Sequence, residues 1–146
     1  MKKLHLLLLM LLCTPFIYAQ SVNKLIDQYK DKPDVVYQTV DKETLKSALG
    51  SDEKLSAIDE IIVLILEDCT PELIKKFSDE IRTIKLNKEY STIIKTTDDD
   101  EYVHILSKSV GDKITELVIL QSESDEAKLV WLKGSGLSVD DLNGIK

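Results

Sequence analysis

Few side chains in this sequence have the chemistry of a catalytic or metal-binding site. Among 146 residues there are two cysteines and two histidines. Cys13 and His5 lie in an apolar amino-terminal stretch, whereas Cys69 and His104 lie in the body of the chain. A thiol and an imidazole that are distant in sequence can meet in space as a nucleophilic pair. Cys69 with His104 is therefore the hydrolase candidate, and Cys69 alone is the redox candidate.

The surrounding residues favour a structural role for both side chains. Cys69 follows an apolar run at 61–66 and precedes a predicted helix start, so we expect a buried and inert thiol. A helix amino terminus lowers the pKa of a thiol, which leaves the reactive alternative open. His104 shares a strand face with Tyr102 and Leu106, which favours a packed or surface histidine over a catalytic base.

Four consecutive acids, Asp98, Asp99, Asp100 and Glu101, form the most conspicuous candidate metal site. Calcium binds several carboxylate oxygens, but this run lacks the spacing of a calcium loop. Consecutive acids between two strands are typical of a solvated turn. The sequence alone leaves open whether Asp98, Asp99 and Asp100 bind a cation.

No established catalytic or phosphate-binding motif is present. The sequence has no nucleophile elbow, phosphate loop or dinucleotide fingerprint, and Gly134 and Gly136 are too few glycines to cradle a phosphate. We therefore assign no catalytic, cofactor-binding or metal-binding residues. We predict no cofactor and a protein that is not an enzyme.

The amino terminus has the pattern of a secretory signal peptide. Lys2 and Lys3 precede an apolar run at 6–13, and the segment ends in Ala19. We predict a signal peptide at 1–19, cleaved after Ala19, and export to the periplasm or the extracellular space. A membrane anchor is the alternative, but the run is shorter than the roughly 20 residues that span a bilayer. A lipid-modified Cys13 is a further alternative, which Leu12 disfavours because that processing prefers a small preceding residue.

The remaining segment, 20–146, has the size of one domain. Cleavage removes two lysines and no acid, so the formal charge changes from −7 to −9. Such an acidic chain is unsuited to nucleic acid or anionic membranes, and it contains no transmembrane segment. Cys69 is then the sole cysteine, which excludes an internal disulfide.

The stretch from Tyr102 to Gly134 predicts three consecutive antiparallel strands. Residues 117–120 are apolar at every position, so both faces of this strand need cover. Glycine and polar residues at 109–113 and 122–126 predict the two turns. We expect the sheet to end at Gly134 and a capped helix to follow at 138–142.

Periodic apolar residues and caps predict the other elements. Helices are expected at 21–30, 41–49 and 70–84, and strands at 35–40, 61–66 and 90–97, with 61–66 at the centre of the sheet and 51–59 unassigned. This order indicates an α+β fold, a two-layer sandwich in which a largely antiparallel sheet carries helices mainly on one face. The apolar residues on the other face need cover from 137–146 or from a second molecule.

Several of these stretches together resemble a known family. They are Thr70-Pro71-Glu72, which opens the long helix, residues 102–106 and residues 111–120. The chain resembles the domain of unknown function 4252 family, small exported proteins of Gram-negative bacteria, over most of 20–146. The resemblance implies location in the cell envelope or outside the cell, and no activity, cofactor or catalytic residue.

These observations lead to two functional hypotheses. The first is an exported cell-envelope protein that binds another envelope protein or associates with itself, without catalysis. The alternative is a small periplasmic thiol-dependent hydrolase or redox protein that uses Cys69.

Overall fold

A computed structural model describes residues 21–50 and 56–138. The predicted signal peptide and nearly all of the predicted terminal helix lie outside these residues. None of the helices within these two ranges has the length and apolarity that crossing a membrane requires.

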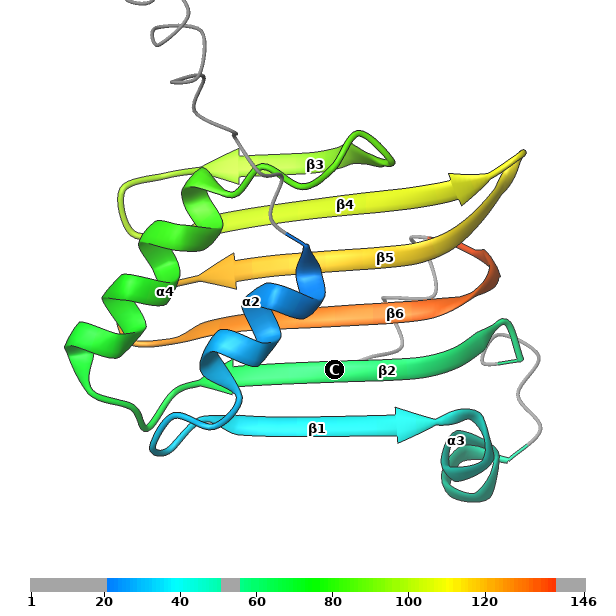
Figure 1. The fold of residues 1–146 in the computed structure, drawn as a ribbon, viewed down its shortest axis with the longest axis horizontal. Coiled ribbons are helices and arrows are strands. Elements are labelled where there is room, and N and C mark those ends of the chain that lie inside the picture. The colour runs from blue at the N-terminus through cyan, green and yellow to red at the C-terminus, as the bar shows by residue number, and fades with distance from the viewer. Residues whose placement is uncertain (1–20, 51–55, 139–146) are drawn as a thin grey trace, which may run out of the picture.

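The described chain forms one six-stranded sheet in which every neighbouring pair is antiparallel (Figure 1). The strand order is β1-β2-β6-β5-β4-β3. The strands are β1 (Val36–Asp41), β2 (Ile58–Leu66), β3 (Tyr90–Thr97), β4 (Tyr102–Val110), β5 (Lys113–Ser122) and β6 (Ala127–Leu137). Together with three helices, this sheet confirms the α+β class.

Strands β4, β5 and β6 are consecutive in sequence and adjacent in the sheet, as predicted. Val110 pairs with Lys113, which leaves Gly111 and Asp112 as a two-residue turn. Gly111 has a φ of 65°, a conformation that glycine adopts without the steric penalty of other residues.

The expected central position of the strand at 61–66 is wrong. β2 lies second from the edge, between β1 and β6. Its continuous apolar run reflects cover on both faces and not a central position. Leu64 packs in the larger core cluster, and Ile61 packs in the smaller cluster on the opposite face.

The expected end of the sheet at Gly134 is also wrong, because β6 continues to Leu137. A Cβ atom at Gly134 would lie 2.0 Å from the carbonyl oxygen of Ala57. The backbone N–H of Ser135 donates to that same oxygen over 3.0 Å, and Leu137 pairs with Ile114. Gly134 therefore permits a close backbone approach within the strand, where a turn was expected.

Two amphipathic helices, α2 (Val22–Tyr29) and α4 (Pro71–Thr83), cover one face of the sheet (Figure 1). Their amino termini are capped as predicted, since the side chains of Ser21 and Thr70 accept from the backbone three residues later. The buried stripes consist of Val22, Leu25, Ile26 and Tyr29 in α2 and Ile74, Phe77 and Ile81 in α4. We call this side the helix face.

The third helix, α3 (Lys42–Leu49), lies at the end of β1 and begins and ends as predicted, with Asp41 as its cap and Gly50 after it. Its Leu45 packs in the smaller core cluster, on the side of the sheet opposite to the helix face. That cluster also contains fully buried Leu117 and Leu132, and Leu137 with 4% of its surface exposed. Apolar side chains thus occupy both faces, while the two-layer sandwich remains a prediction.

Candidate functional site

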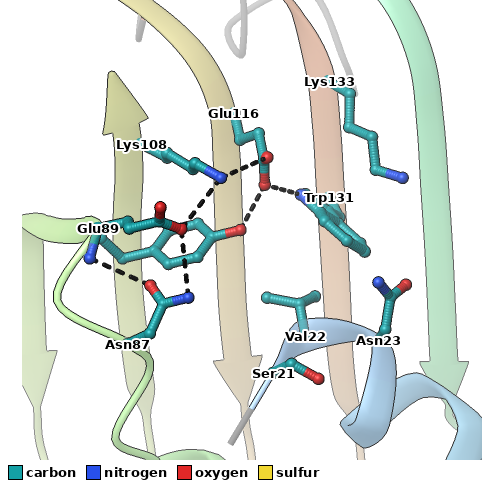
Figure 2. A pocket seen from close by; sticks show the side chains of 10 residues that line it. Ser21, Val22, Asn23, Asn87, Glu89, Lys108, Glu116, Trp131 and Lys133 are labelled. Atoms are coloured by element: carbon teal, nitrogen blue, oxygen red, sulfur yellow. Dashed lines mark hydrogen bonds and ion pairs between the residues drawn. The ribbon is translucent and has the colours of Figure 1, made fainter. Parts of the chain in front are cut away.

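A cavity of about 340 Å³ opens on the helix face, between the start of α2, the loop before β3 and strands β4, β5 and β6 (Figure 2). It is lined by Ser21, Val22, Asn23, Asn87, Glu89, Tyr90, Lys108, Glu116, Trp131 and Lys133. Polar and charged residues dominate this lining.

The Glu116 carboxylate is the centre of the cavity's hydrogen bonds. Its Oε2 atom accepts from the Trp131 indole Nε1–H over 2.9 Å and from the Tyr90 hydroxyl. Figure 2 shows the carboxylate between the Lys108 ammonium and the Trp131 indole. Burial raises the pKa of Tyr90, and the hydrogen bond to Glu116 raises it further. The Tyr90 phenol therefore remains a donor.

Both lysines of the cavity also contact carboxylates. Lys108 Nζ lies 3.1 Å from Glu89 and 3.6 Å from Glu116, and the hydrogen bond to Glu89 is the first cause of a raised Lys108 pKa. Lys133 Nζ lies 3.0 Å from a Glu60 oxygen and 4.0 Å from the centre of the Trp131 ring. Each ammonium thus has a carboxylate partner within the protein. The Lys108–Glu116 pair links β4 with β5, and the Lys133–Glu60 pair links β6 with β2.

This arrangement suits binding or structural support better than acid–base chemistry. A general base needs a free lone pair within reach of the proton that it removes. One Glu116 oxygen already accepts two hydrogen bonds, and the other faces Lys108. The Glu116 carboxylate is thus held by Tyr90, Trp131 and Lys108, which favours a structural role for it.

Of the packed and surface positions that the sequence left open for His104, the structure shows the packed one, with 6% of its surface exposed. The Tyr102 hydroxyl donates to the Ile81 carbonyl oxygen, so it accepts from His104 Nδ1, 3.1 Å away. Nε2 must then accept from the Thr92 hydroxyl at 2.8 Å. Burial, with a smaller contribution from Lys95, lowers the His104 pKa. The imidazole is neutral and both of its nitrogens are engaged.

Cys69 is buried, and its thiol lies 3.7 Å from the carbonyl oxygen of Pro33. Burial raises the Cys69 pKa, and the charges of Asp34 and Asp68 raise it further. The raised Cys69 pKa is the opposite of the lowered pKa that a helix amino terminus can give a thiol. The partners of Cys69 and His104 differ, so the structure does not bring the two together as a nucleophilic pair.

The acidic residues 98–101 form the predicted turn between β3 and β4. The Asp98 N–H donates to the Glu101 carbonyl oxygen over 2.8 Å, and all four side chains are exposed. Within 21–50 and 56–138, no group of three or more His, Cys, Asp or Glu side chains is arranged to hold a metal ion.

The family comparison agrees with the resemblance seen in the sequence. The family model described as "Domain of unknown function (DUF4252)" matches residues 29–145. The chain belongs to this family. Searches of curated proteins and of solved structures found no match.

The DUF4252 match spans the sheet and the cavity residues on β4, β5 and β6. Sequence reasoning missed the cavity, although one signal was available. Glu116 shares the inward face of its strand with Val118 and Leu120, and a charged residue in an inward position needs partners. Its partners Tyr90 and Trp131 come from other strands and cannot be identified from local spacing.

The two edge strands of this DUF4252 domain are its other candidate surface. In β3, every residue after Tyr90 is exposed. In β1, Val36 is 45% and Tyr37 41% exposed. In the described part of the chain, no strand pairs with the outer edge of either strand. Large apolar side chains beside such an edge are a surface on which another strand can pair.

Proposed function

We propose that this DUF4252 protein is exported from a Gram-negative cell after cleavage behind Ala19 and acts in the periplasm or outside the cell as a non-catalytic protein-binding module. Lys2, Lys3 and the apolar run at 6–13 support export. We further propose that its core is a two-layer sandwich and that its partner adds a strand at β1.

The observation that carries this proposal is the outer edge of β1, with which no strand pairs among residues 21–50 and 56–138. From Val36 to Val40 the strand contains no charged residue and no proline, and its pairing with β2 is continuous. Natural proteins commonly protect free edges with charges, prolines or bulges. An unprotected edge with exposed Val36 and Tyr37 therefore favours pairing with another polypeptide.

The alternative thiol chemistry has less physical support. A thiol reacts as its thiolate, and burial with two nearby acids disfavours ionisation of Cys69. His104, the one histidine among the described residues, is occupied by Tyr102 and Thr92.

The experiment combines localisation with site-specific crosslinking. A photo-crosslinking amino acid replaces Val36 in the full chain, and a matched control carries it at Lys76, exposed on α4. We expect the protein in the envelope fraction, with the intact mass of a chain that begins at Gln20. We also expect a crosslinked polypeptide with the probe at Val36 and none with the probe at Lys76. Cytoplasmic protein that still begins at Met1 contradicts export, and equal adducts from both positions contradict a partner at β1.

A further inference from the structure

We infer that the partner at β1 is a second copy of this chain, which pairs antiparallel to the first about a two-fold axis at Gln38. This inference rests on the proposed strand addition at β1 and specifies its partner. The resulting assembly joins two six-stranded sheets edge to edge.

The choice of β1 over β3 follows from the pairing of each edge strand. The β3–β4 register shifts between Thr92 and Ile94, which marks a bulge, and β3 carries the charged Lys95. Bulges and lysines are two of the devices that keep an edge from pairing. The β1–β2 register runs without a shift from Val36 to Asp41. β1 is therefore the edge strand with the more regular backbone for pairing with another strand.

Symmetry restricts the register to a few possibilities. In an antiparallel pair related by a two-fold axis, one residue faces its own copy, and opposed side chains lie on the same face. An axis at Gln38 opposes Val36 to Val40 and Tyr37 to Thr39. An apolar pair then lies on one face, and an aromatic residue opposes a β-branched one on the other, both of which are favourable cross-strand pairs.

The neighbouring registers are chemically poorer. An axis at Tyr37 pairs Val36 with Gln38 and so leaves the valine opposite a polar residue. An axis at Thr39 opposes Tyr37 to the charged Asp41 and Val40 to Gln38. The strand ends at Asp41, so only residues within Val36–Asp41 enter this comparison. The apolar pattern of the strand thus selects the axis at Gln38.

The net charge of the chain opposes association at long range. Two copies that have lost residues 1–19, and with them Lys2 and Lys3, carry a formal charge of −9 each instead of −7 and repel one another. Dissolved salt screens that repulsion beyond about 10 Å at 0.1 M. The strand contacts are short-range and mostly uncharged. Association through β1 should therefore strengthen as moderate salt is added, unlike association driven by surface ion pairs.

Cysteine substitutions test this register directly. Opposed Cα atoms in an antiparallel pair are about 4.5 or 5.5 Å apart, within the range that a disulfide spans. Gln38→Cys should form a disulfide-linked dimer under mild oxidation. Tyr37→Cys alone should not, whereas a mixture of Tyr37→Cys and Thr39→Cys should give the mixed dimer. All variants keep the buried Cys69, so the wild type measures its background.

The outcomes separate this inference from the proposed function. Light scattering of the wild-type protein, after complete cleavage behind Ala19, should give twice the mass of the cleaved chain. The fraction of dimer should increase at moderate salt. A monomeric wild type whose Gln38→Cys form does not crosslink overturns the self-pairing. If Val36 still crosslinks a different protein in the envelope, strand addition at β1 stands and only the identity of the partner was wrong. Crosslinking from Tyr37→Cys alone overturns the register.

Discussion

Replacement of Glu116 by glutamine should destabilise the protein more than the same replacement at Glu89. Both acids lie beside Lys108, but only Glu116 also accepts from Trp131 and Tyr90. A hydrogen bond to a charged group contributes about 1.5–3 kcal/mol and a neutral one about 0.5–1.5, so two such bonds lose roughly 2 kcal/mol in Glu116→Gln. The Glu89 side chain is 60% exposed, and Glu89→Gln should unfold close to the wild type.

Urea unfolding followed by the fluorescence of Trp131, the single tryptophan, measures both variants. With an m-value of about 2 kcal/mol/M, Glu116→Gln should lower the midpoint by roughly 1 M. The indole N–H resonance of Trp131 should move in Glu116→Gln and stay in place in Glu89→Gln. Equal midpoints for the two variants, or an unmoved resonance, refute the central role of the Glu116 carboxylate.

Three further predictions concern other parts of the core. Burial holds the pKa of His104 in the folded protein below the unfolded value of about 6.5. The free energy of unfolding should therefore fall as the pH drops from about 6.5 towards the folded pKa, and it should stay level above about pH 6.5. His104→Gln should flatten this pH dependence. Cys69 should resist alkylation in the folded protein and react on unfolding in urea, and rapid native modification supports the thiol alternative. Gly134→Ala should lower the free energy of unfolding by about 1–3 kcal/mol, measured by thermal or urea unfolding, because the new Cβ would meet the Ala57 carbonyl oxygen. Ser135→Ala should leave the free energy of unfolding nearly unchanged.

Local signals in the sequence predicted the three described helices, α2, α3 and α4, well. Ser21, Asp41 and Thr70 each cap the helix that follows, through side-chain bonds that span three residues. The apolar spacing of 70–84 likewise predicted the buried face of α4, including the fully buried Phe77. Such features depend on neighbours within one or two turns, which is why a single sequence contains them.

Features that depend on distant partners were not predictable in this way. Glycines at 134 and 136 are typical of a turn, and only the position of Ala57 shows why Gly134 belongs within a strand. The position of β2 in the sheet depends on its pairing with β6. The cavity likewise depends on which side chains the strand order places around Glu116.

The difference between the two edges also limits how large an assembly through β1 can grow. A two-fold contact at β1 uses the same edge of both copies, so pairing consumes both open edges at once. The outer edges of the joined sheet are then the two β3 strands, which carry the bulge at Thr92 and the charge of Lys95. A third copy finds no regular, uncharged edge on which to pair. The contrast between β1 and β3 within one sheet therefore favours an assembly that closes at two chains.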